Sequence, residues 1–169
     1  MKTFSILIVC LLTACTQQLK RPDSLITSSD SISLLKMIKD REKAMINKDI
    51  NSITQQFDTN ATFINGGGFY YEGINEIRQF HKSMFDNDSL TYTYKIGVPL
   101  INSIQKNTAI IYYPWQQLWT MKNVKSDTLN EVGLMTIIAV KENGNWKWKS
   151  ITNQRTKEFF NDLKKHKAK

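Results

Sequence analysis

Few side chains in this sequence could carry acid–base or metal chemistry. The 169 residues include two histidines, His81 and His166, and no His-x-His or His-x-x-x-His spacing. A single imidazole does not assemble a metal site, so we expect no metal and no other cofactor. His81 falls on the apolar side of a predicted helix, where it could act as a base or proton donor at a pocket mouth. The commoner interpretation is a core histidine whose hydrogen bonds are satisfied.

An aromatic run offers a candidate binding wall: Tyr112-Tyr113-Pro114-Trp115-Gln116-Gln117-Leu118-Trp119. Side chains alternate along a strand, so Trp115, Gln117 and Trp119 share one face. This face could grip a ring or a sugar. It could equally be the sheet surface on which two copies of the chain form a homodimer. Pro114 indicates a bulge or a sheet edge within the run.

Polar residues at the end of the last predicted strand could bind an anion. Asn153 and Arg155 share a face and offer amide and guanidinium donors to a carboxylate or phosphate. The alternative is a strand end that meets solvent, which we favour. Tyr70, beside the turn Gly66-Gly67-Gly68, is a candidate rim residue. That turn lacks the Lys-Ser/Thr of a phosphate-binding loop, which argues against nucleotide binding.

These residues must be positioned by helices followed by long strands. Apolar residues recur at helical spacing over residues 30–47 and 50–57, and a third helix follows Gly73. Two short strands at 61–65 and 69–72 flank the glycine turn. Alternation predicts longer strands at 90–100, 109–119 and 132–140, and a last strand at 146–155 after a hairpin turn. This order predicts an α+β fold.

The N-terminal sequence resembles a bacterial lipoprotein signal. Lys2 precedes an apolar run that is too short to span a bilayer and that ends in Leu12-Thr13-Ala14-Cys15. The resemblance implies that residues 1–14 are removed and that acyl chains on Cys15 hold the protein at a membrane. We therefore expect a cell-envelope location on the periplasmic side, at the outer membrane in a Gram-negative cell. Cys10 leaves with the signal, so no free thiol remains.

The polar, proline-punctuated stretch 15–29 is typical of a tether, which leaves a domain at 30–156 and a basic tail at 157–169. The formal charge of +8 would suit nucleic acid in a cytoplasmic protein. The expected location and the dispersed lysines argue against that partner. We expect the tail to be solvated or to face the envelope.

Three segments give the domain a family resemblance: Ala61-Thr62-Phe63-Ile64-Asn65, Tyr71-Glu72-Gly73 leading into Ile74-Asn75-Glu76-Ile77, and Gly144-Asn145-Trp146-Lys147-Trp148. In their order they resemble the SnoaL-like and nuclear-transport-factor-2-like superfamily, from about Ser31 to Thr156. The resemblance implies a cystatin-like cone, in which N-terminal helices pack on a curved, mostly antiparallel sheet and the interior is apolar.

The resemblance also points to departures from the family's catalytic pattern. Isomerases and cyclases of this superfamily use a carboxylate base on the first strand, and the matching position here is Asn65, whose amide cannot take a proton at neutral pH. The isomerases place a tyrosine where this chain has Arg41. An arginine at this position could stabilise an anion, but because Asp40 and Glu42 flank Arg41, we expect it to be solvated or ion-paired. Standard isomerase or cyclase chemistry is therefore not expected.

Three functions remain open at this point. The first is an envelope lipoprotein that binds a small, largely apolar organic molecule, with Asn65, Tyr70, His81, Trp115, Trp119, Asn153 and Arg155 as candidate ligand-binding residues. The second is an isomerase, dehydratase or hydrolase of the same superfamily with a non-standard site, in which His81 would act with Asn65 or Arg155. The third is an interaction module that uses the tryptophan face for dimerisation or for docking another protein.

Overall fold

The structure is a computed structural model that describes residues 25–86, 89–122 and 128–166. Its elements are α1 (Ser28–Ile46), α2 (Ile50–Thr54), β1 (Phe57–Ile64), β2 (Tyr70–Glu72), α3 (Gly73–Phe85), β3 (Leu90–Ile96), β4 (Leu100–Gln105), β5 (Thr108–Met121), β6 (Thr128–Glu142), β7 (Asn145–Arg155) and a 3₁₀ turn, η1 (Leu163–Lys165). The predicted α+β order is confirmed.

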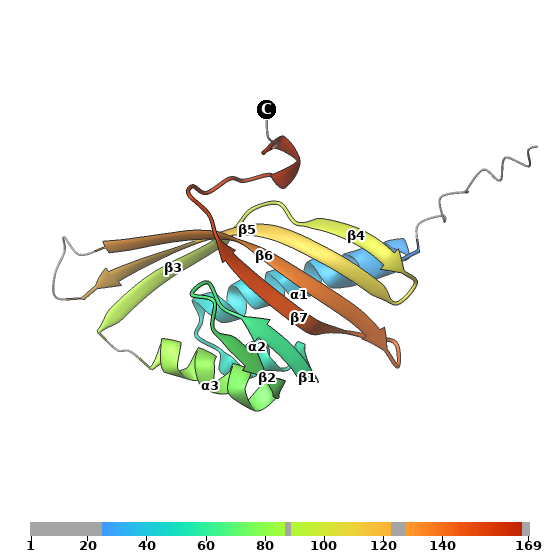
Figure 1. Cartoon of the computed structure of the whole chain (residues 1–169), viewed down its shortest axis with the longest axis horizontal. Coiled ribbons are helices and arrows are strands. Elements are labelled where there is room, and N and C mark those ends of the chain that lie inside the picture. The colour runs from blue at the N-terminus through green and yellow to red at the C-terminus, as the bar shows by residue number, and fades with distance from the viewer. Residues whose placement is uncertain (1–24, 87–88, 123–127, 167–169) are drawn as a thin grey trace, which may run out of the picture.

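The strands form a seven-stranded sheet in the order β2-β1-β7-β6-β5-β3, with β4 also paired to β5. Every pairing is antiparallel except that of β1 with β7. Figure 1 shows the helices on one side of the long, curved strands and the C-terminal segment on the other. The expected cone of helices on a mostly antiparallel sheet is therefore confirmed.

The predicted strand at 90–100 is wrong, because β3 and β4 are two strands that pair in succession with β5. Pro114 lies at the junction between them. The Pro114 carbonyl oxygen accepts a hydrogen bond from Gly97 N at 2.8 Å. The nitrogen and the carbonyl of one residue in an antiparallel strand point to the same side, so the Pro114 nitrogen, which has no hydrogen to donate, also faces the junction between β3 and β4. Pro114 thus interrupts the ladder on one side of β5, while Pro114 and Leu134 remain partners on the other side.

The predicted helix at 50–57 also ends too late, since α2 ends at Thr54 and β1 begins at Phe57. Phe57 pairs with Trp148 of β7, and both side chains are buried. Its apolar spacing fitted the helix, but pairing with a distant strand decides its conformation.

One face of α1 supplies the middle of the core. Leu34 and Ile38 are buried together with Ile111 of β5 and Ile137 of β6. Burying four such side chains contributes on the order of 1.5–3 kcal/mol each. The helix is thereby held against the centre of the sheet, which fixes the direction of its other side chains.

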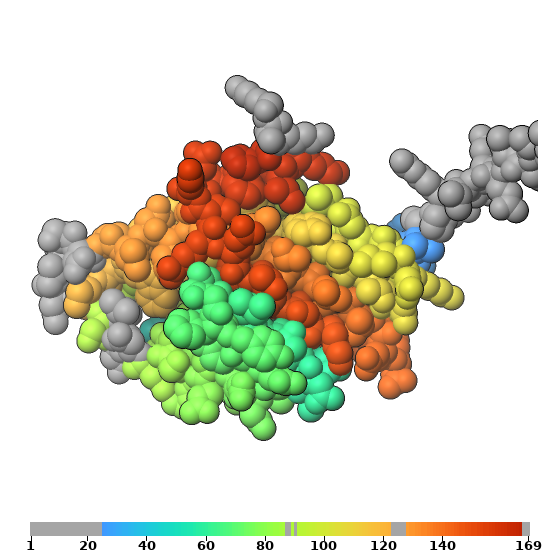
Figure 2. All heavy atoms as spheres, in the orientation of Figure 1, coloured from blue at the N-terminus to red at the C-terminus, as the bar shows by residue number. Residues whose placement is uncertain are grey.

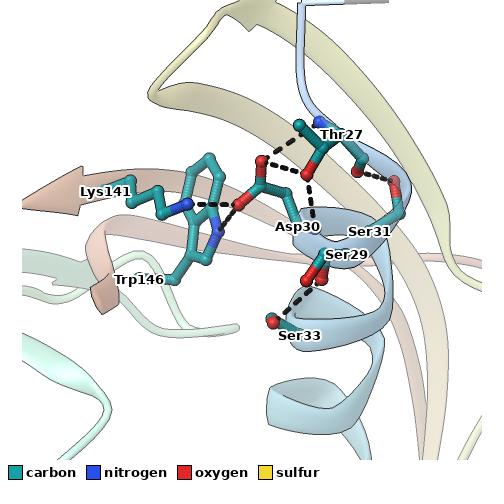
Figure 3. A network of polar contacts seen from close by, with 7 residues as sticks. All are labelled: Thr27, Ser29, Asp30, Ser31, Ser33, Lys141 and Trp146. Atoms are coloured by element: carbon teal, nitrogen blue, oxygen red, sulfur yellow. Dashed lines mark hydrogen bonds and ion pairs between the residues drawn. The ribbon is translucent and has the colours of Figure 1, made fainter. Parts of the chain in front are cut away.

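Asp30 joins the start of α1 to the far end of the sheet (Figure 3). It forms a capping box with Thr27, the N-cap of the helix. Its Oδ1 also accepts from Lys141 Nζ at 2.6 Å and from Trp146 Nε1 at 3.0 Å. Both oxygens of this buried carboxylate therefore accept hydrogen bonds.

The described part of the basic tail, residues 157–166, packs on the sheet (Figure 2). Val98 N donates to Asn161 O at 2.7 Å, and Lys95 Nζ lies 4.5 Å from the centre of the Phe159 ring. Up to residue 166 the backbone of the tail therefore contacts the segment between β3 and β4, while Lys157, Lys164 and Lys165 are exposed, as expected of a solvated basic tail.

No helix among the described residues is long and apolar enough to cross a membrane. The predicted signal and most of the predicted tether, Cys15 included, lie outside the described residues.

Candidate functional site

A cavity of about 200 Å³ lies between the sheet, α1, α3 and the β1–β2 turn. Its walls combine aromatic and methionine side chains with a few polar groups: Arg41, Met45, Phe63, Asn65, Gly66, Gly67, Phe80, His81, Met84, Tyr94, Trp115, Gln117, Trp119, Glu131, Met135, Asn153 and Arg155. Such a mixture is typical of small-molecule sites. Six of the seven predicted ligand-binding residues line the cavity; Tyr70, which is 54% exposed, does not.

Arg41 corrects the sequence-based expectation, because it is only 2% exposed and lines the cavity. Neither flanking carboxylate reaches it. Asp40 pairs with Lys36, while Glu42 pairs with Lys39 and accepts from Ile96 N. Successive residues of a helix point about 100° apart, so the neighbours of an inward-facing arginine face elsewhere.

The Arg41 guanidinium has weak neutral neighbours. Nη2 lies 3.4 Å from His81 Nε2, and the guanidinium carbon lies 5.5 Å from the centre of the Phe57 ring. Nε and Nη1 have no hydrogen-bond partner. Within the described residues, no carboxylate forms an ion pair with this cation.

His81 is 1% exposed, and its geometry defines its tautomer. Nδ1 lies 2.8 Å from Ile77 O, and a carbonyl can only accept, so Nδ1 carries the proton. Nε2 then presents its lone pair to Arg41. Burial and the Arg41 charge lower the pKa of His81 to about 3, so the ring is neutral at physiological pH.

This state of His81 limits its chemistry. It cannot donate a proton from Nε2, and with such a low pKa it is a poor general base at neutral pH. It is a buried histidine with both ring nitrogens engaged, as the commoner interpretation predicts, yet it also forms part of the cavity wall.

Asn65 holds the glycine turn. Its Oδ1 accepts from Gly67 N at 2.9 Å and from Phe69 N at 3.0 Å, and its Nδ2 lies 3.4 Å from the Tyr71 hydroxyl. These bonds shape the loop that closes one end of the cavity. The position at which the family resemblance implies a base therefore carries a turn-forming amide in this chain.

The tryptophan face lies inside the cone. Trp115, Gln117 and Trp119 all line the cavity, as their shared face predicts. Trp115 Nε1 donates to Asn153 Oδ1 at 2.7 Å, which fixes both side chains. Trp115 is only 3% exposed, whereas Trp119 is half-buried, so Trp119 is the tryptophan of this face that another protein could still reach.

The more exposed end of the cavity carries a charge pair that includes a residue missed in the sequence. Glu131 Oε2 accepts from Trp119 Nε1 at 3.0 Å, and Oε1 pairs with Arg155 Nη2. The Arg155 side chain is 60% exposed. Its charge is compensated, so this strand end meets solvent while also contributing to the rim. Glu131 became recognisable only through its cross-strand pairing with Gln117.

Other polar groups deep in the cavity have few partners. Gln117 Nε2 is buried without a hydrogen-bond partner, and the buried Tyr94 hydroxyl has the neighbouring Tyr113 hydroxyl as its nearest polar group. Burial raises the pKa of Tyr94 well above its usual value, so the hydroxyl stays neutral. Among the described residues, no cluster of three or more His, Cys, Asp or Glu side chains could hold a metal ion. The deep end therefore offers donors and apolar contacts.

No protein-family model and no curated protein sequence matches the chain. Solved structures do match it. A type 2 hexachlorocyclohexane dehydrochlorinase (LinA) has a TM-score of 0.69 at 9% identity, over 83% of this chain and 94% of that protein. A Novosphingobium aromaticivorans protein proposed to be a scytalone dehydratase has a TM-score of 0.68 at 11% identity, over 79% and 88%.

A protein of unknown function with a cystatin-like fold, from Nostoc punctiforme, has a TM-score of 0.64 at 14% identity, over 79% of this chain and 96% of its own. At such identities the likeness shows the fold and no activity. This chain has a cystatin-like α+β fold.

Proposed function

We propose that this protein is an envelope lipoprotein whose cone-shaped domain binds a small, largely apolar organic molecule. The observation that carries the proposal is the cavity of about 200 Å³, walled by aromatic and methionine side chains and containing unpartnered buried donors. Apolar walls supply affinity, and a few placed donors orient a ligand.

The hydrogen bonds of the tryptophans support a preformed site. Trp115 is tied to Asn153, and Trp119 is tied to Glu131. Side chains that are already fixed lose little conformational entropy when a ligand enters. A cavity of this volume suits a molecule of about one ring, since an apolar protein cavity of about 150 Å³ is large enough to bind benzene.

Binding fits the side chains better than catalysis does. An enzyme of this fold would need a proton acceptor aimed at the substrate. His81 is a poor base, Asn65 is an amide engaged in the turn, and Glu131 is paired with Arg155. The enzymes among the structural neighbours share the fold, and their activities do not transfer to these side chains.

The experiment is native mass spectrometry on residues 16–169, before and after extraction with organic solvent. We expect a reproducible adduct of one ligand per chain that extraction removes. A protein that never carries an adduct, and whose melting temperature no compound in a library of small aromatic and aliphatic molecules raises, would contradict the proposal.

A further inference from the structure

Arg41 is a buried charge without a counter-ion. The buried charged side chains of the described residues are Asp30 and Arg41, with His81 neutral. Asp30 accepts bonds from Lys141, Trp146 and Thr27. Arg41 has only neutral neighbours: His81 Nε2 at 3.4 Å, the face of Phe57, and the hydroxyl of Tyr113, whose pKa burial raises. The buried charge near the start of α1 is therefore compensated by its partners, whereas the buried charge nearer the end of α1 is not.

An uncompensated buried cation is costly. Its desolvation penalty amounts to several kcal/mol unless a counter-charge or a full set of hydrogen bonds offsets it. A guanidinium has five N–H donors and no ordinary way to lose its charge, and Nε and Nη1 carry three of these donors. Both atoms lack a partner, while the side chain lines the cavity.

No neighbour can become the missing anion. The Tyr94 hydroxyl, which also lines the cavity, has its pKa raised by burial and remains neutral. His81 already uses its lone pair on Arg41. Glu131, the cavity's carboxylate, is paired with Arg155 at the more exposed end. None of the described residues therefore supplies the counter-charge of Arg41.

We infer that the ligand of this cavity is a monoanion, a small carboxylic acid with an aromatic or branched apolar body, whose carboxylate meets Arg41. This inference rests on the proposed function and names its ligand class. One unpaired cation matches one negative charge, and the only other arginine in the lining is already paired. The Tyr94 hydroxyl and Gln117 Nε2 are further neutral donors in residues of the cavity wall.

The rest of the cavity fits the body of such an acid. Phe63, Phe80 and Trp115 offer ring faces and edges, and Met45, Met84 and Met135 fill the gaps between them. With the charged group at Arg41, the apolar body would lie against these side chains and point toward the turn at Gly66 and Gly67. A phosphate monoester carries about two charges at neutral pH and would leave one uncompensated.

The test compares acids with their neutral amides. The probes are benzoate with benzamide, phenylacetate with phenylacetamide, and 3-methylbutanoate with 3-methylbutanamide. Each is titrated calorimetrically into residues 16–169, which keep every element described above. We expect at least one acid to bind about tenfold or more tightly than its amide, because charge-assisted hydrogen bonds to a buried guanidinium are the stronger ones.

Arg41→Met removes the charge and keeps a long apolar side chain. In this variant we expect the acid to lose its preference, to within about twofold of the amide. Arg78→Met is the matched control, because Arg78 is exposed on α3 and bonds to Asn51 away from the cavity. It should keep the wild-type ratio.

The outcomes separate the two proposals. Amides that bind as tightly as their acids to the wild-type protein would overturn the anion inference and leave ligand binding intact. An acid preference that survives Arg41→Met would also overturn it. If no probe binds and native mass spectrometry finds no adduct, the proposed function fails as well. Should Arg41→Met not fold, the wild-type ratio decides alone.

Discussion

At the scale of single residues, His81 makes the stability of the fold depend on pH. Burial and the charge of Arg41 lower its pKa to about 3, whereas an unfolded histidine titrates near pH 6.5. Below pH 6.5 the histidine is therefore protonated in the unfolded chain, whereas in the folded chain it stays neutral down to about pH 3. The contribution of neutral His81 to the free energy of unfolding is fully present above pH 6.5. Below this pH the free energy of unfolding should fall by up to about 1.4 kcal/mol per pH unit.

Urea unfolding of the wild type and of His81→Gln between pH 7 and 4.5 measures this slope. The window stops just above the ordinary glutamate pKa of about 4.3, and the carboxylates that begin to titrate there are common to both proteins. The variant should be less stable at pH 7 but show a flatter dependence on pH. Equal slopes in the two proteins would remove His81 as the cause.

Asp30 should stabilise the fold through its partners on β6 and β7. Asp30→Asn keeps the shape of the side chain and removes the charge that Lys141 and Trp146 meet (Figure 3). We expect a loss of about 2 kcal/mol in the free energy of unfolding, as for hydrogen bonds to a charged group. Asp40→Asn is the control, since its pair with Lys36 is exposed and worth under about 1 kcal/mol. Equal losses would show that the buried network adds nothing special.

Some site residues were predictable because one strand places them together. Period two put Trp115, Gln117 and Trp119 on one wall, and Asn153 on the wall beside them. Arg41 and Glu131 were not recognised. Arg41 was judged by its neighbours in sequence, Asp40 and Glu42, although these point away from it around the helix. Cross-strand pairing brought Glu131 to the cavity, and the sequence holds no local signal for such pairing.

At the scale of elements, the junction between β3 and β4 depends on Gly97. A Cβ at this position would lie 2.5 Å from Asn161 O, where neither backbone can move without breaking the Val98–Asn161 hydrogen bond. Gly97→Ala should therefore destabilise the protein by about 1–3 kcal/mol and loosen the docked C-terminal segment. Urea unfolding and limited proteolysis within residues 157–166 measure the two effects.

Gly66→Ala is the control for this prediction, because its new Cβ would meet atoms at an ordinary 3.5 Å. It should leave both readouts near the wild-type values. If protease cleaves Gly97→Ala no faster than Gly66→Ala within residues 157–166, the docking of the C-terminal segment does not depend on the close approach at Gly97.

The order of helices and strands was largely predictable, and the errors lie where distant segments meet. The alternation of apolar residues continues through Ile96, Val98 and Leu100, but Gly97 and Pro99 between them are local signals of a break that the alternation obscured. The division follows from Pro114 in the partner strand and from the C-terminal segment against Gly97. Residues 157–166 read as a basic tail because their contacts, Phe159 with Lys95 among them, span long stretches of chain.

At the scale of the whole molecule, this chain shares its fold with enzymes, but the fold does not determine the chemistry of its cavity. The neighbours in structure include a dehydrochlorinase, yet this chain carries Asn65 and a neutral His81 in its cavity. A fold that hosts many activities defines where a pocket lies, and the side chains decide what the pocket does. In this chain they support the proposed binding of an anionic ligand and offer no group suited to proton transfer at neutral pH among those described in the cavity.

The proposed position of this domain at a membrane depends on Cys15. We propose that Cys15 is acylated after removal of residues 1–14, since two or more acyl chains anchor a protein where one gives only marginal binding. In bacteria fed an alkyne-tagged palmitate, the wild-type protein should take up the tag and sediment with membranes. Cys15→Ser should lose both properties. Cys10→Ser is the matched control, because the same change within the apolar run leaves the acylation site in place. A tag that persists in Cys15→Ser would exclude Cys15 as the anchor and leave the domain's location open to another route.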